Sequence, residues 1–200
     1  MKRVSSLVLG GALLFALLAA PVLTLAAPNA RGEKPGIAVL QFKTKAENQR
    51  WNNGGAQATQ DAFGIELVKI NFRVVGREEF EARMRGENLP LSGDVNPRTA
   101  RQIGKLLNVK YLITGSVTEY GPIDQGDFGL SGKRNFKAAL NAHLIDTSTG
   151  GVVWADEASE MAPRGEAGVD DSEMFEKTMK PCIQKLTASL FALVREEAGL

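Results

Sequence analysis

Few side chains in this 200-residue sequence could carry out catalysis, because it contains one histidine, His143, and one cysteine, Cys182. His143 lies on the polar side of an alternating segment, with no serine, cysteine or acid beside it to form a catalytic relay. Cys182 falls on the apolar stripe of the last predicted helix, where cysteine behaves as a small hydrophobic residue. A single cysteine also cannot form an intramolecular disulfide or a thiolate metal site. We therefore predict no catalytic residue and no metal ligand.

A glycine-rich segment, residues 121–132, precedes Lys133 and has the composition of a phosphate-binding loop. Its spacing differs from the G-x-x-x-x-G-K-[ST] motif, because Arg134 stands where the hydroxyl would be needed. Asp124 and Asp127 lack the further oxygen ligands that calcium requires. We expect this segment to be a loop that binds no cofactor.

The composition is that of a globular chain without a strong charge bias. Hydrophobic residues make up 44% and charged residues 24%, which argues against intrinsic disorder. Lysine and arginine number 24 and aspartate and glutamate 23, so the formal charge is +1. This balance gives no reason to expect nucleic-acid binding, which needs a basic excess on one face. The length suits one domain, or two small ones at most.

Residues 1–27 have the pattern of a secretory signal peptide. Two basic residues precede the apolar segment 7–20, and the small residues Ala26 and Ala27 each suit cleavage. The apolar segment is shorter than the roughly 20 residues that a membrane-spanning helix needs. We expect residues 28–35 to form a flexible leader and the mature chain to reach the periplasm, with outer-membrane association as an alternative.

Hydrophobic periodicity predicts one domain, residues 36–200, with the element order β-α-β-α-α-β-β-β-α. Helices between the early strands indicate crossovers, and the late strands indicate an antiparallel meander. The predicted fold is α/β, with helices packed on a mixed sheet in a three-layer-like domain. The predicted strands are 36–42, 72–75, 109–120, 133–146 and one that starts at Val152, and the predicted helices are 57–70, 77–88, one that starts at Pro97 and one after Asp170 with an interruption at Pro181.

Several residues are expected to stabilise this fold. Arg77 follows a buried strand, where it would hydrogen-bond backbone carbonyls or pair with Glu87, so that Arg77→Ala would lower the melting temperature sharply. An asparagine before a proline is typical of a helix N-terminus, and an aspartate and a glycine bound the turn after the alternating strand. The residues with an expected structural role are Arg77, Glu87, Asn96, Pro97, Asp146 and Gly150.

An ordered set of segments between about Gly36 and Trp154 resembles the curli production assembly/transport component family. The resemblance implies an α/β domain that is shared with activators of peptidoglycan synthases and with the N-terminal domain of the Tol-Pal translocation protein. The fold is therefore better supported than the role. The segments are residues 37–42, residues 72–77 with 87–89 and 92–93, residues 99–107 running into 111–120, and residues 144–146 with the turn 149–150.

The family includes an outer-membrane secretion lipoprotein that is anchored by an acylated cysteine and spans the membrane with two hairpins per subunit. Here no cysteine lies near the expected cleavage site, and only residues 133–146 alternate over the about 9–11 residues of a spanning strand. We therefore expect a soluble, non-enzymatic envelope protein that acts through protein–protein contacts, as an accessory to outer-membrane assembly or secretion. The alternatives are a subunit of a ring-shaped secretion channel, a periplasmic activator of a peptidoglycan synthase, and an enzyme such as a hydrolase.

Two loops are candidate partner surfaces, since binding residues are often carried by loops on a rigid sheet. The segment 43–56 corresponds by position to the constriction loop of the family's channel, which presents an aromatic residue and an asparagine. Because the motif of that loop does not align with this segment, we prefer a role in docking to a partner. The segment 121–132 is the second candidate. The expected partners are envelope proteins, with a homo-oligomer as an alternative and no nucleic acid. The candidate residues are Trp51, Asn52 and Asn53 in the first loop and Asp124, Asp127 and Phe128 in the second.

Overall fold

The computed structural model describes residues 34–44, 55–87, 89–93, 95–123, 134–164 and 170–198. These residues belong to one unit, Lys34–Leu200. The expected signal peptide and nearly all of the expected leader lie outside the described residues, as do the candidate residues of both loops. The signal peptide, the leader and the domain boundaries therefore stay predictions.

A six-stranded mixed sheet forms the frame of the unit, and the predicted α/β fold is confirmed. The strand order is β3-β1-β4-β5-β6, and β2 pairs with β4. The three short strands pair in parallel, whereas β4, β5 and β6 form an antiparallel meander. The strands are β1 (Gly36–Val39), β2 (Lys43–Thr44), β3 (Arg73–Val74), β4 (Tyr111–Ile123), β5 (Arg134–Asp146) and β6 (Val152–Arg164).

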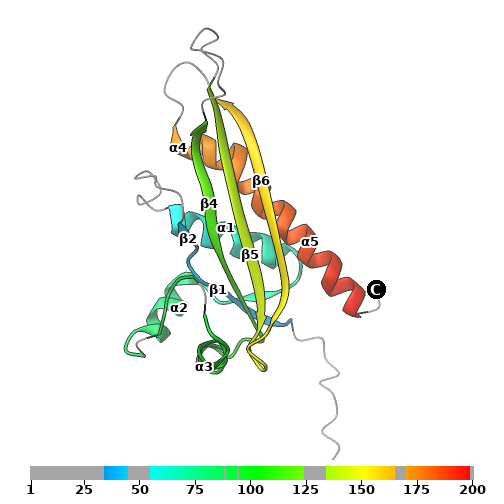
Figure 1. The fold of residues 1–200 in the computed structure, drawn as a ribbon. Coiled ribbons are helices and arrows are strands. Elements are labelled where there is room, and N and C mark those ends of the chain that lie inside the picture. The colour runs from blue at the N-terminus through cyan, green and yellow to red at the C-terminus, as the bar shows by residue number, and fades with distance from the viewer. Residues whose placement is uncertain are drawn as a thin grey trace, which may run out of the picture. The chain divides into compact units, whose positions relative to one another are not determined.

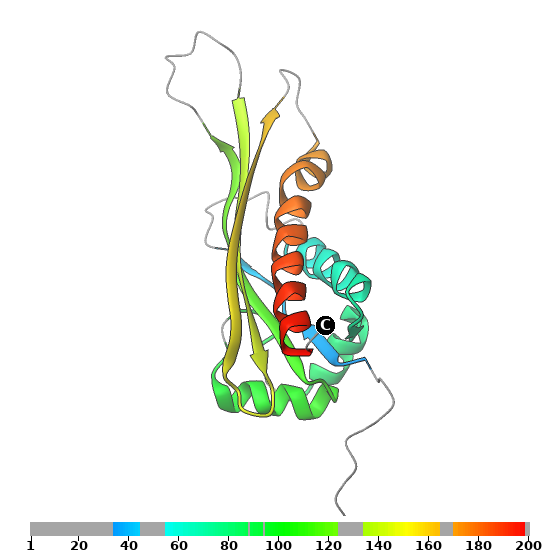
Figure 2. The ribbon, with the colours of Figure 1, turned by 90° about the vertical axis from the view of Figure 1, so that its right-hand side faces the viewer.

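Helices cover the two faces of the sheet unequally (Figures 1 and 2). The helices α1 and α5 pack on one face, and α2 and α3 lie at the end of the sheet near β1. A π-helical turn, η2, joins α4 to α5 and is separated from Pro181 by one residue. This turn is the interruption of the helix that the proline predicts. The helices are α1 (Gly55–Lys69), α2 (Arg77–Met84), α3 (Pro97–Leu107), α4 (Asp171–Met174), η2 (Phe175–Met179) and α5 (Lys180–Ala198).

The sheet separates two hydrophobic cores. Alternate residues of β1 enter different cores, Ile37 on the side of α1 and α5 and Ala38 on the side of α2 and α3, so β1 is buried on both faces as its unbroken apolar run predicts. The alternation of β5 is also confirmed. Its fully buried face, which packs in the core with α5, consists of Phe136, Ala138, Leu140, Ala142 and Leu144.

The strands β4, β5 and β6 have 13 residues each and form what we call the ribbon. The predicted ends of the two outer strands are corrected: β4, predicted to end at Tyr120, continues through Gly121 and Pro122 to Ile123, and β6 includes Pro163, which was expected in a loop. Beyond the last pairing with β2, at Val117, β4 pairs with β5 alone among the described residues, so an outward-facing proline costs no ladder hydrogen bond there. Pairing with β5 thus overrides the local glycine and proline signals. The expected loop at residue 43 is likewise corrected, since β2 pairs with β4.

Candidate functional site on the open face of the ribbon

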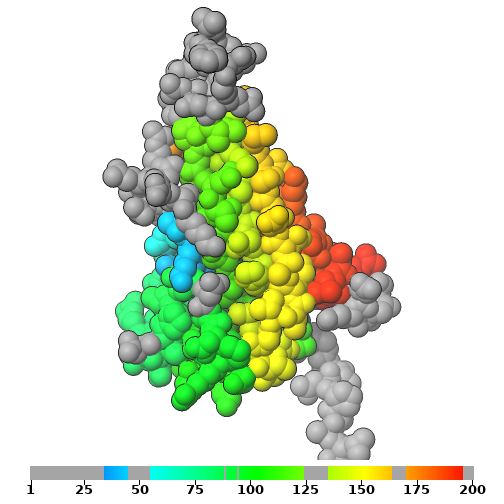
Figure 3. Space-filling model, in the orientation of Figure 1, coloured from blue at the N-terminus to red at the C-terminus, as the bar shows by residue number. Residues whose placement is uncertain are grey.

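Away from the end where α3 packs on Leu112 and Ile145, the ribbon has one face that no described helix covers. Figure 2 shows α5 along the opposite face, and Figure 3 shows the strands as a continuous surface on the uncovered side. On β6 every second side chain, from Ala155 to Pro163, is exposed on this side, whereas its neighbours turn toward α5. We call this surface the open face. Its described side chains include Thr118, Glu119, Lys137, Asn141, Glu157, Ser159 and Met161.

A β-bulge decides which side chains of β4 reach the open face. The register shifts between Val117 and Glu119, so that Thr118 is the extra residue. If β4 alternated regularly through Thr118, with no bulge, Glu119 would point toward α5 and Tyr120 toward solvent, because a slip of one residue exchanges the two faces of a strand. The bulge therefore returns Tyr120 to the core and places Glu119 on the open face.

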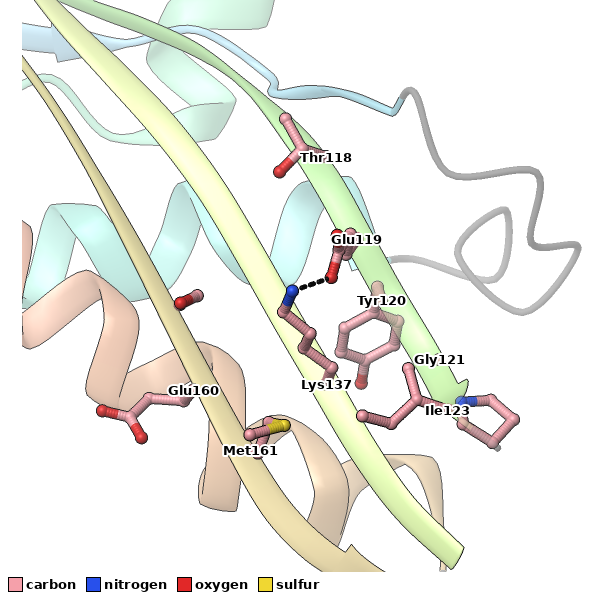
Figure 4. A pocket seen from close by; sticks show the side chains of 10 residues that line it. Thr118, Glu119, Tyr120, Gly121, Ile123, Lys137, Glu160 and Met161 are labelled. Atoms are coloured by element: carbon pink, nitrogen blue, oxygen red, sulfur yellow. Dashed lines mark ion pairs between the residues drawn. The ribbon is translucent and has the colours of Figure 1, made fainter. Parts of the chain in front are cut away.

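An open hollow of about 930 Å³ lies on the ribbon beside this bulge (Figure 4). The Lys137 ammonium lies 2.6 Å from the Glu119 carboxylate and forms a diagonal ion pair between β5 and β4. Met161 lies at the β6 side, and its side chain is 55% exposed. The hollow is lined by residues 118–123, Lys137, Ser159, Glu160 and Met161.

The buried side of the ribbon holds the hollow in place. Tyr120 packs edge-on against Phe136, with ring centroids 4.9 Å apart, and its hydroxyl donates to the Asp171 carbonyl at 3.3 Å. Burial, with a smaller contribution from the Asp171 charge, raises the pKa of Tyr120 to about 12. Glu160 forms an ion pair with Lys185, which ties β6 to α5. The open face is therefore a surface on a rigid support.

The residues that could have done chemistry lie apart from one another. His143 is half-buried on β5, opposite Thr114 and Ala155 of the neighbouring strands. Cys182 lies on α5 and is fully buried in the hydrophobic core, as its position on the apolar stripe predicts. Its thiol lies 3.7 Å from the Ala138 carbonyl. Among the described residues, no group of three or more histidines, cysteines or acids could hold a metal ion. No helix in the described segments is long and apolar enough to cross a bilayer.

The predicted helix N-terminus and turn are both present. Asn96 accepts a hydrogen bond from the Thr99 N–H at 2.9 Å, and Pro97 is the first residue of α3. In the turn after β5, the Ser148 hydroxyl donates to the Asp146 carboxylate at 2.5 Å and lowers its pKa. Gly150 has φ +76°, and a Cβ there would collide with Pro97 backbone. This glycine lets the turn pack against the start of α3.

Arg77 has partners other than the expected one. Its guanidinium lies 3.3 Å from Asp61 of α1 and 3.8 Å from Glu81 of α2, and its side chain is 38% exposed. Glu87 is exposed beyond the end of α2. The pairing with Glu87 is therefore corrected to a partly exposed link between α1 and α2.

Sequence reasoning missed the open face. Its residues come from three strands and become neighbours only through the strand register and the Thr118 bulge. A usable signal was the position of Tyr120, since strict alternation from Val117 would expose this aromatic side chain. An aromatic residue on the polar side of a predicted strand indicates a bulge.

Comparisons with known proteins show the family through a family model and the fold through solved structures. Residues 19–178 match the family model "Curli production assembly/transport component CsgG". Lipoprotein GNA1162 from Neisseria meningitidis has a similar structure, with 15% identity, a TM-score of 0.54 and coverage of 83% of this chain and 99% of that chain. The hypothetical protein CT253 from Chlamydia trachomatis is also similar, with 12% identity, a TM-score of 0.50 and coverage of 81% and 96%. No curated protein sequence matches significantly. The family match spans well over half of the sequence, and the chain therefore belongs to the CsgG family.

Proposed function

We propose that this chain is a non-enzymatic envelope protein that binds other envelope proteins through the open face, as an accessory to assembly or secretion at the outer membrane. The observation that carries the proposal is the open face itself: a hollowed surface on three long strands, supported from behind by α5 and left uncovered by the described helices. Membership of the CsgG family supports the envelope setting. The expected signal peptide, residues 1–27, would deliver the chain to the periplasm.

The chemistry of the open face suits protein recognition. The half-exposed Lys137 lies opposite the exposed apolar side chain of Met161, and the half-exposed Asn141 lies farther along β5, opposite Glu157. Interfaces commonly combine an apolar contact with a polar surround, and methionine is enriched in them. Because the strands are paired along their length, little ordering is needed on binding. The candidate residues Trp51 and Asp127 belong to the same proposal, since their segments follow β2 and β4 in the sequence.

Crosslinking in cells tests the proposed surface. A photoreactive amino acid replaces Met161 or Thr118 on the open face, and Val68, which is 54% exposed on α1, serves as the control. We expect adducts with another protein from the two open-face positions and few from Val68. Adducts from Val68 alone, equal adducts from all three positions, or no adducts from the open face would contradict the proposal.

Extraction distinguishes the accessory role from the channel alternative. An accessory protein is expected to leave the periplasm without detergent or with mild washing. Rings that need detergent for extraction and survive SDS would overturn the accessory role in favour of a channel subunit. Capture of a peptidoglycan synthase by the open face would instead identify the activator alternative.

A further inference from the structure

The outer edge of β6 has no strand paired to it among the described residues. β6 is the last strand of the sheet and pairs only with β5. In an antiparallel edge strand, every second residue directs its main-chain N–H and C=O away from the sheet. The Glu157 N–H donates to the Asp156 carboxylate at 2.8 Å, and we infer that Glu157 is one of these outward residues. By alternation, Ala155, Ser159 and Met161 are the others near it.

Natural edge strands are usually protected from pairing, and β6 is weakly protected in its middle. The common devices are prolines, bulges and charged side chains, lysine above all, and of these only acidic side chains occur in the middle of β6. In β6 the bulge lies near Val152 and the proline is Pro163, so both are at the ends. The segment between them, residues 154–162, contains no proline, glycine or lysine. By contrast, the edge of β4 beyond Val117, where no described strand pairs on the side away from β5, is interrupted by the Thr118 bulge and by Pro122.

The helix α5 fixes β6 in the geometry that an added strand would need. The Trp154 indole donates to the Ser189 hydroxyl at 3.4 Å, and Glu160 pairs with Lys185. These contacts act near the two ends of the unprotected segment, on the side away from the open face. An added strand would therefore extend the sheet without displacing α5.

The charges of β6 select the kind of strand that could pair with it. Asp156 and Glu157 place two adjacent negative charges at the centre, and Glu160 follows. A second copy of β6 would bring acid opposite acid in each twofold antiparallel register centred on residues 156–158, and like charges opposite each other are destabilising. Lysine or arginine at these positions of a partner would pair with the two acids and draw Asp156 away from the Glu157 N–H.

We propose that β6 accepts an extended, basic segment of a partner polypeptide as an additional strand. Main-chain hydrogen bonds to outward residues such as Glu157 and Ser159 would supply affinity, and Asp156 and Glu157 would supply selectivity for basic side chains. This inference rests on the proposed function, since the added strand would continue the open face. It goes further by naming the main-chain edge as the binding element and a basic strand as its occupant.

Peptide binding to the full chain tests the occupant. The probes are a fluorescent TKVKVTKVKV peptide and its acidic counterpart TEVEVTEVEV, measured by fluorescence anisotropy at low and at physiological salt. We expect the basic peptide to bind at least tenfold more tightly, and the double variant D156N/E157Q to lose at least tenfold of that affinity. Equal binding of the two peptides, or no binding of the basic one, would overturn the proposal.

A backbone test separates strand addition from simple charge attraction. Ser159→Pro removes an outward N–H without changing the charge, and we expect it to reduce binding of the basic peptide at least tenfold. The matched control is Ser159→Ala, which keeps the N–H and is expected to bind normally. Undiminished binding by a folded Ser159→Pro variant would contradict strand addition.

Hydrogen exchange on the unaltered chain keeps the test decisive if Ser159→Pro fails to fold. The bound peptide should slow amide exchange at least tenfold at Ala155, Glu157, Ser159 and Met161, and unchanged exchange there would overturn the proposal. Failure of the added-strand proposal can be distinguished from failure of the proposed function. Crosslinks from Met161 in cells, together with no peptide protection of β6, would retain the open face as a binding surface and reject the added strand.

Discussion

The rings of Phe42 and Phe63 stack with their centroids 5.0 Å apart and their planes 16° apart. Phe42 lies between β1 and β2, and Phe63 lies on α1, so the stack joins the first helix to the sheet. Gly115 of β4 makes this possible, because a Cβ there would collide with the Phe42 ring and with the Asn141 carbonyl oxygen. The glycine is required for close approach of its neighbours.

Gly115→Ala is expected to lower the free energy of unfolding by about 1–3 kcal/mol, the usual cost of overpacking a filled core. The added methyl group must displace either an aromatic ring or the backbone of β5, and neither moves easily. Urea denaturation followed by circular dichroism measures the change.

Gly64→Ala is the matched control for this change. A Cβ at Gly64, within α1, would meet only Val74 at an ordinary contact distance of 3.6 Å. Alanine should therefore raise the free energy of unfolding by roughly 0.5–1 kcal/mol, as expected inside a helix. A Gly115→Ala variant as stable as the wild type would show that Phe42 does not pack on this strand.

The cap of α3 predicts a second, smaller effect. Asn96→Ala removes the acceptor for the Thr99 N–H and should cost about 0.5–2 kcal/mol of stability. Asn96→Asp keeps an acceptor at the same place and should retain most of the stability. Thermal denaturation of the two variants provides the comparison, and equal losses would show that the side-chain hydrogen bond is not the cause.

Arg77→Ala is expected to have little effect, in contrast to the sharp loss that the sequence suggested. Its partners Asp61 and Glu81 are 49% and 33% exposed, and such pairs contribute only about 0–1 kcal/mol. A cation in the first turn of α2 also opposes the helix dipole, which offsets part of that gain. A double-mutant cycle with Asp61→Ala measures the coupling, and a value well above 1 kcal/mol would restore the structural role.

The sequence predicted the middle of the meander well and its flanks poorly. β5 alternates strictly because one of its faces fills the core with α5, so its predicted bounds differ from the observed ones by one residue. β6 carries Asp156 and Glu160 on its inner face, where Lys185 pairs with Glu160. Charges on both faces remove the periodic signal, and only the start of this strand was predictable.

The open face depends on pairings between residues that lie far apart in the sequence, and no short segment of the sequence reveals them. β2 forms because Lys43 and Thr44 pair with Ser116 and Val117, far along the chain. The Glu119–Lys137 ion pair depends on the Thr118 bulge and on the register between β4 and β5. The charge balance of the composition offered no reason to expect nucleic-acid binding, but the position of a surface formed by three strands required the register.

The buried Cys182 thiol predicts that the folded protein loses stability at alkaline pH. Burial, with a smaller contribution from the Glu160 charge, raises the pKa of Cys182 to about 12 from a usual value of 9.0. Since the folded state keeps its proton longer, this contribution to stability is complete below pH 9 and is lost as the pH rises toward 12. Between these values the wild type should lose on the order of 1 kcal/mol per pH unit relative to Cys182→Ala, which has no thiol to ionise. Urea denaturation of both proteins at pH 8, 9.5 and 10.5 measures the difference, and parallel stability curves would show that the thiol is accessible to water in the folded protein.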